Sequence, residues 1–146
     1  MLELYKQAVQ VRWSDLDPNF HLRHSVYYDW GAFIRTQFLY AHGLTADVLQ
    51  ELRIGPILFR EECIFRREIR SDDKVEIDVK LLKAKKDFSR WSIQHHITKN
   101  GDILSAVLTI DAAWLNLIER KLTTPPALVH EVFNKIPKAD SFEWIG

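Results

Sequence analysis

The chain has 146 residues, and its 20 Lys plus Arg balance its 20 Asp plus Glu, so the formal net charge is zero. Hydrophobic residues make up 47% and charged residues 27%, which are values of an ordinary folded domain and exclude a disordered chain. Because a neutral chain has no overall positive field to attract a polyanion, we expect no nucleic-acid partner.

A single domain is expected over residues 1–146, since this length suits one domain and no repeat or linker-like stretch divides it. The single cysteine, Cys63, excludes an internal disulfide and a metal-thiolate cluster. No stretch approaches the ~20 apolar residues of a membrane span, and the first residues lack the apolar run of a signal peptide. We therefore expect a cytoplasmic protein with no membrane partner.

The first predicted elements are a strand and a long helix that are joined by a turn. Residues 5–13 predict the strand because they are rich in strand-forming side chains. Residues 15–19 predict the turn, since Pro18 disfavours helix at the residue before it. Residues 25–42 predict the helix, with Ser25 as its N-cap and apolar side chains at spacings of three and four. Apolar side chains cover most of its sides, so the helix should be enclosed rather than lie on a surface.

Strands with period two and one short helix fill the rest of the chain. The strands are predicted at residues 57–69, 74–85, 89–99 and 103–116, and the helix at residues 127–135. Short polar turns separate the strands, and Asn100-Gly101 is the strongest hairpin signal among them. One apolar helix followed by an antiparallel meander predicts an α+β fold, in which a sheet of about five strands curls around the long helix.

A short motif surrounds the turn before the long helix. Residues 11–18 read Val-Arg-Trp-Ser-Asp-Leu-Asp-Pro, and His21 and the pair Val26-Tyr27 follow. Together with the order of the later strands, this motif resembles the 4-hydroxybenzoyl-CoA thioesterase family of the hotdog-fold thioesterases, over residues 7–136. The resemblance implies a hotdog fold and hydrolysis of an acyl-CoA thioester. It implies no cofactor, because coenzyme A enters as part of the substrate.

The resemblance also implies roles for residues near the turn. Asp17 would be the catalytic carboxylate, as a nucleophile or as a general base toward water. The backbone N–H of His24, at the start of the helix, would bind the oxyanion that develops on the thioester carbonyl. Phe20, His21 and Tyr27 would contact the substrate. Because the family often has Gly where this chain has Phe20, we expect an altered acyl pocket.

Other interpretations of the same residues stay open. Asp17 could simply shape the turn before Pro18. Asp15, two residues earlier, is expected to pair locally. His21 and His24 have the spacing of a metal-binding pair, but no further ligand has a suitable spacing, so no metal is expected.

One basic cluster lies in the predicted hairpin that joins residues 74–85 to residues 89–99. Lys85, Lys86 and Arg90 could bind the phosphates of coenzyme A, and the resemblance places the nucleotide here. A solvated hairpin tip would have the same composition.

The main prediction is therefore an acyl-CoA thioesterase. The alternatives are a hotdog hydratase or dehydratase acting on acyl thioesters, and a non-catalytic protein that binds acyl-CoA. Because an exposed edge strand is a liability and hotdog proteins usually assemble, we expect a homodimer or homotetramer with its sites at the subunit interface.

Overall fold

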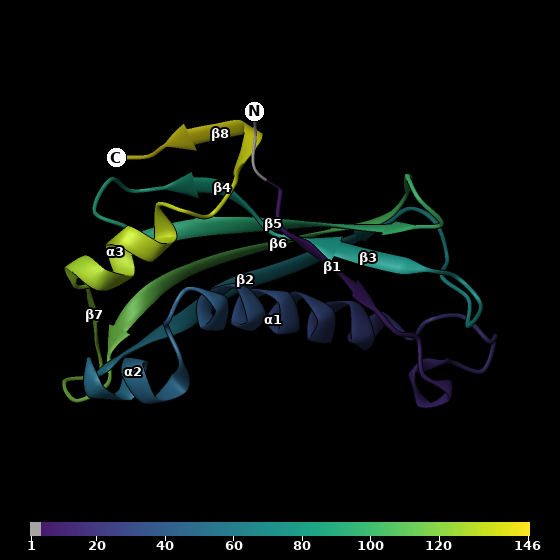
Figure 1. Cartoon of the computed structure of the whole chain (residues 1–146), viewed down its shortest axis with the longest axis horizontal. Coiled ribbons are helices and arrows are strands. Elements are labelled where there is room, and N and C mark those ends of the chain that lie inside the picture. Colours follow the sequence, from purple (N-terminus) through teal and green to yellow (C-terminus); the bar gives the residue numbers. More distant parts are fainter. Residues whose placement is uncertain (1–3) are drawn as a thin grey trace.

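The computed structural model describes residues 4–146, which form one sheet of eight strands and three α-helices (Figure 1). The helices are α1 (His24–Ala41), α2 (Ala46–Glu51) and α3 (Ala127–Phe133). The strands are β1 (Lys6–Val9), β2 (Ile54–Phe65), β3 (Val75–Asp78), β4 (Lys80–Ala84), β5 (Arg90–Lys99), β6 (Ile103–Asn116), β7 (Lys121–Thr123) and β8 (Lys138–Trp144). None of the helices in these residues is long and apolar enough to cross a membrane.

The sheet is built around β5 and β6, which are its two long central strands. β2 and β7 pair with β6, while β3 and β4 pair one after the other with β5. β1 pairs with β3, and β8 pairs with β4. Every pairing is antiparallel except that between β4 and β8. Within the described residues β2 pairs only with β6, so one side of β2 is an open edge.

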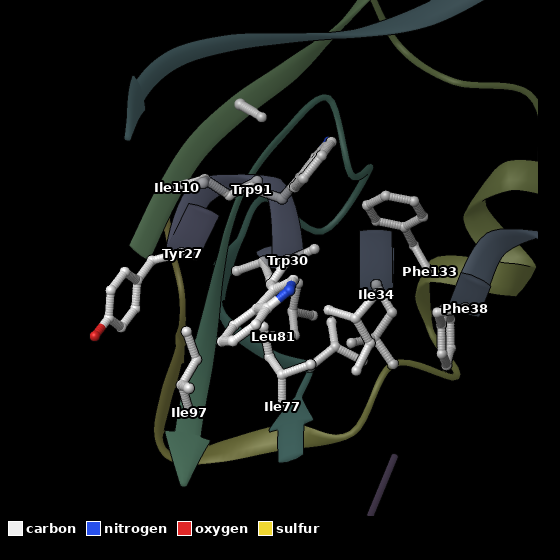
Figure 2. Close-up of a cluster of buried hydrophobic side chains, with 14 of the residues drawn as sticks. Tyr27, Trp30, Ile34, Phe38, Ile77, Leu81, Trp91, Ile97, Ile110 and Phe133 are labelled. Atoms are coloured by element: carbon white, nitrogen blue, oxygen red, sulfur yellow. The ribbon is translucent and has the colours of Figure 1, made fainter. Parts of the chain in front are cut away.

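Helix α1 lies along one face of this sheet (Figure 1). The expectation that the helix is enclosed is wrong for this chain, because Phe33 and Tyr40 on its outer side are exposed. Its buried side chains belong to Val26, Tyr27, Trp30, Ile34 and Phe38, and Figure 2 shows four of them among side chains of the sheet. Full burial of such a side chain contributes ~1.5–3 kcal/mol to stability.

The approach of α1 to the sheet requires glycine at one position. A Cβ atom on Gly31 would lie 2.3 Å from the Leu108 side chain of β6. That separation is far below van der Waals contact, so a larger residue would push the helix away from the sheet.

The prediction of about five strands is wrong, because the sheet contains eight. The predicted strand at residues 74–85 is interrupted at Val79, whose N–H donates to the carbonyl of Tyr5 (3.1 Å). Before this interruption β3 pairs with β1, and after it β4 pairs with β8. β7 and β8 were not predicted. β8 has a single buried residue, Ala139, so its sequence lacks the alternation of buried and exposed side chains that predicts a strand. It is a strand because its main chain pairs with that of β4.

The two ends of the segment before α1 also differ from the prediction. The first strand ends at Val9, and residues 13–15 form a short 3-10 helix instead of continuing it. Ser25 is not the N-cap, because α1 begins at His24 and Arg23 occupies the cap position. The Ser25 hydroxyl accepts a hydrogen bond from the Arg23 side chain (2.9 Å) instead of from the helix backbone. The predicted C-terminal helix is confirmed, although α3 ends two residues earlier, at Phe133.

Candidate active site

The turn between the 3-10 helix and α1 fixes the orientation of the Asp17 carboxylate. Oδ1 accepts hydrogen bonds from the backbone N–H groups of Asn19 (2.9 Å) and His21 (3.1 Å). The Asp17 carbonyl accepts from the N–H of Phe20 (2.9 Å), and the Asp17 N–H donates to the His21 carbonyl (2.8 Å). Both backbone donors therefore bind the same carboxylate oxygen, and Oδ2 is left for other partners.

A cavity of about 320 Å³ lies beside this turn. Its walls come from the loop that carries Asp17, from the first turn of α1, and from the end of β2 with the residues that follow it. The lining residues are Asp17, His21, Leu22, His24, Tyr27, Phe65, Arg66, Arg67 and Glu68. Four residues singled out in the sequence (Asp17, His21, His24 and Tyr27) thus share one cavity, which we call the Asp17 cavity.

The start of α1 carries free backbone donors, and its first residue, His24, lines this cavity. The N–H of Val26 donates to the Arg23 carbonyl (3.0 Å), and no side chain caps the helix. In residues 4–146 the N–H groups of His24 and Ser25 have no hydrogen-bond acceptor. Such groups at a helix N-terminus favour a negative charge.

Tyr27 contributes a buried phenol to the Asp17 cavity. Its ring packs edge to face against Phe65, with the ring centroids 4.9 Å apart. Burial, together with the nearby Cys63, Asp17 and Glu68, raises the pKa of Tyr27 to about 12. The phenol is therefore protonated at neutral pH and can donate a hydrogen bond.

Glu68 lines the cavity although the sequence does not single it out. Its Oε2 lies 3.0 Å from Nε2 of His21. The segment containing it is brought to the turn by a hydrogen bond from the Leu22 N–H to the Ile69 carbonyl (2.7 Å). Because this contact joins residues 47 positions apart, no local sequence pattern could have indicated it.

Phe20 lies outside the lining of the Asp17 cavity. Its ring is 65% exposed, and its centroid lies 6.4 Å from that of Trp13, which is also exposed. The backbone of Phe20 has φ = 65°, in the left-handed region that favours glycine. The turn therefore has the conformation suited to Gly but carries a bulky side chain.

The basic hairpin lies far from the Asp17 cavity of the same chain. Lys85 and Lys86 occupy the turn between β4 and β5, and Arg90 begins β5. Lys99, at the other end of β5, donates from Nζ to the carbonyl of Glu68 (2.6 Å) at the Asp17 cavity. A strand of this length spans about 30 Å, so the structure does not bring the hairpin and Asp17 together within one chain (Figure 1).

Asp15 pairs locally, as predicted. Its buried carboxylate accepts hydrogen bonds from the backbone and the guanidinium of Arg12, at 2.8 to 3.2 Å. These bonds hold the pKa of Asp15 below its usual range. Among residues 4–146 no group of three or more His, Cys, Asp or Glu side chains is arranged to hold a metal ion.

Burial and the nearby Glu61 raise the pKa of the Cys63 thiol to about 11. The thiol is therefore protonated at neutral pH, which does not suit a nucleophile.

Comparison with known proteins identifies the family. The sequence matches the model of the thioesterase-like superfamily over residues 11–133. The chain belongs to the thioesterase-like superfamily. No curated protein matches the sequence of this thioesterase-like protein.

Solved structures with low sequence identity share the fold of this thioesterase-like protein. A hypothetical protein from Staphylococcus aureus in complex with CoA has a TM-score of 0.83 and 16% identity, covering 95% of this chain and 89% of that one. A 1,4-dihydroxy-2-naphthoyl-CoA thioesterase from Synechocystis has a TM-score of 0.81 and 14% identity, covering 91% and 97%. A DHNA-CoA thioesterase from Staphylococcus aureus has a TM-score of 0.76 and 15% identity, covering 90% and 89%. These likenesses support the predicted hotdog-like fold.

Proposed function

We propose that this protein hydrolyses an acyl-CoA thioester to a free acid and CoA, with Asp17 as its catalytic carboxylate. The observation that carries the proposal is the convergence of three groups on one cavity. They are an oriented carboxylate (Asp17), an unpaired backbone N–H group at the start of α1 (His24) and a protonated phenol (Tyr27). Family membership supports the same reaction class.

In this mechanism the Asp17 carboxylate either attacks the thioester carbonyl carbon or takes a proton from a water that attacks it. The carbonyl oxygen becomes an oxyanion, which the N–H group of His24 stabilises through a hydrogen bond, together with the helix dipole. Breakage of the C–S bond then expels the CoA thiolate, and the acyl group leaves as a carboxylic acid. If Asp17 attacks directly, water must hydrolyse the resulting anhydride.

We also propose that the active assembly contains more than one chain. The basic hairpin is about 30 Å from the Asp17 cavity of its own chain. If Lys85, Lys86 and Arg90 bind the nucleotide of a CoA substrate, the thioester of that substrate therefore lies in the Asp17 cavity of another subunit. The open edge of β2 supports such an assembly. It exposes the large apolar side chains of Leu58, Phe59, Ile64 and Phe65.

The substitution Asp17→Asn tests the proposal, because it keeps the size of the side chain and removes the base. We expect kcat for the best acyl-CoA to fall about 100-fold or more, measured by detection of the released thiol. The unfolding midpoint should change little, since the amide oxygen can still accept from the two backbone N–H groups.

Asp15→Asn is the matched control. It should lower thermal stability, because it weakens charged hydrogen bonds at a buried site, while the kcat of the folded fraction stays close to that of the wild type. Retention of wild-type turnover by Asp17→Asn would show that the catalytic assignment is wrong.

One observation favours a second candidate, a hydratase or dehydratase acting on acyl thioesters. His21 and Glu68 lie 3.0 Å apart in the Asp17 cavity, which is the His–carboxylate pair that such acid–base chemistry needs. An enoyl-CoA substrate separates the two functions. Hydration removes the enoyl absorbance without releasing a thiol, whereas hydrolysis releases the thiol.

A further inference from the structure

A second cavity, of about 280 Å³, lies between the later turns of α1 and the sheet. The lining residues are Ala32, Arg35, Thr36, Phe38, Leu39, Pro56, Leu58, Val79, Trp91, Ile93, Trp114, Phe133 and Ile136. None of them lines the Asp17 cavity. We call this second space the Arg35 cavity. Figure 2 shows two of its aromatic walls, Trp91 and Phe133, above α1.

Arg35 is the one charged residue in this otherwise largely apolar lining. Its side chain is 13% exposed, and its Nη2 lies 3.8 Å from Oε2 of Glu61, which is too far for a hydrogen bond. Burial lowers the pKa of Arg35 to about 10, so the guanidinium is still charged at neutral pH. The guanidinium is therefore a largely buried cation that is paired with Glu61 by charge alone, without a hydrogen bond.

The other neighbour of the guanidinium is a histidine that carries no charge. His95 is fully buried, and burial lowers its pKa to about 3. Its Nδ1 donates to the carbonyl of Asp78 (2.7 Å), so Nε2 accepts from Nη1 of Arg35 (2.9 Å). His95 therefore orients the guanidinium without offsetting its charge.

Two of the aromatic residues that line the cavity carry unpaired donors that lie behind its walls. The indole N–H groups of Trp91 and Trp114 are buried and have no hydrogen-bond partner. Buried donors are normally paired, because an unpaired one costs about 1–3 kcal/mol. Because these nitrogens expose almost no surface, they do not face the cavity, and the apolar parts of the two rings form its walls.

We propose that the Arg35 cavity binds an amphipathic monocarboxylate, with its apolar body among the aromatic walls and its carboxylate on Arg35. A guanidinium binds carboxylates through charge-assisted hydrogen bonds, and a bound carboxylate could approach it more closely than Glu61 does at 3.8 Å. The volume of about 280 Å³ is near the lower end of the about 300–1,000 Å³ of ligand pockets, so we expect a small ligand such as a medium-chain fatty acid or a small aryl acid. Entry is open on the side of Ala32 and Thr36, which are exposed on α1.

Titration calorimetry of the full chain with octanoate tests this site. We expect octanoate to bind at pH 8, and both acetate and 1-octanol to bind at least ten-fold more weakly, since each lacks one half of the ligand. Arg35→Met should weaken octanoate binding about ten-fold or more, the loss expected for one charge-assisted hydrogen bond. Glu61→Gln should tighten it, because the competing carboxylate is removed. This second variant tests the site even if Arg35→Met fails to fold.

The location of the bound acid is tested by a matched pair of substitutions on α1. Ala32 lines the cavity and Ala41 does not, and both are exposed on α1. Ala32→Phe should abolish octanoate binding and Ala41→Phe should leave it unchanged, as should Asp17→Asn in the other cavity. Equal affinity for octanoate and 1-octanol, an equal effect of the two Phe variants, or no octanoate binding at all would overturn the proposal.

Discussion

Two carboxylates only two residues apart have different environments at the candidate site. The side chain of Asp15 is 1% exposed and is bonded to Arg12, so it has no capacity left for chemistry. Asp17 is held by backbone N–H groups on one oxygen and faces a cavity. The contrast follows from the 3-10 turn at residues 13–15, which directs the first side chain inward before the chain reverses at the second.

Phe20 has a large side chain although its backbone adopts the left-handed conformation that favours glycine. A left-handed conformation costs a residue with a Cβ about 1–2 kcal/mol, and glycine loses about 0.5–1 kcal/mol through its greater freedom in the unfolded chain. We therefore expect Phe20→Gly to raise the free energy of unfolding by roughly 0.5–1 kcal/mol, measured by urea denaturation.

Phe20→Ala is the comparison variant, because it removes the ring but keeps the Cβ. It should be less stable than Phe20→Gly, since its backbone remains strained. A Phe20→Gly protein that is less stable than the alanine variant would mean that the backbone strain at this position costs less than the freedom that glycine gains in the unfolded chain.

Among the elements, the β4–β5 hairpin carries a basic cluster that would either bind the phosphates of CoA or be merely solvated. If Lys85, Lys86 and Arg90 bind the nucleotide of CoA, replacing all three by Gln should raise KM for acyl-CoA about ten-fold or more. KM for a short thioester without the nucleotide should not change. Steady-state kinetics with both substrates measures the difference.

Lys74→Gln serves as the control for this change, since Lys74 is exposed next to β3 and outside the hairpin. It should leave both KM values unchanged. An equal loss for the two substrates in the triple variant would indicate that the hairpin is only a solvated tip.

At the scale of the whole molecule, the Asp17 cavity lies by the start of α1 and the Arg35 cavity lies by its later turns. Gly31 lies between them on the helix, where α1 packs so tightly on Leu108 of β6 that no Cβ fits. The Arg35 guanidinium lies beside this glycine, where its Nη1 donates to Nε2 of His95 on β5 (2.9 Å). The close packing of helix and sheet therefore separates the two spaces, each with its own polar groups.

The open edge of β2 predicts self-association of the whole chain. Unpaired backbone groups and exposed apolar side chains on one strand favour pairing with a second copy. Light scattering at micromolar concentration should give at least twice the 17.2 kDa of one chain. Ile64→Lys, on the β2 edge, should shift the protein toward monomer.

Ile118→Lys is the matched control, because Ile118 is also exposed but lies in the turn after β6. It should leave the mass unchanged. A wild-type protein that is monomeric at these concentrations would contradict both the assembly and a site shared between subunits.

Local sequence determined the identity of most elements and the turn that carries Asp17. The apolar spacing of α1, the alternation in β5 and β6, and Pro18 each act over a few residues, so they can be recognised without the fold. These signals also placed Asp17, His21, His24 and Tyr27 near one another, since they lie within eleven residues of chain.

Only the tertiary structure decided which distant segments meet. The pairing of β8 with β4 depends on main-chain bonds such as that from the Leu81 N–H to the Pro137 carbonyl (2.7 Å). Contacts across the fold likewise bring Glu68 to the Asp17 cavity, hold the basic hairpin away from it, and place Arg35 beside Glu61 and His95. Main-chain hydrogen bonds and packing form wherever the folded chain brings two surfaces together, and this depends on the whole sequence rather than on a local pattern.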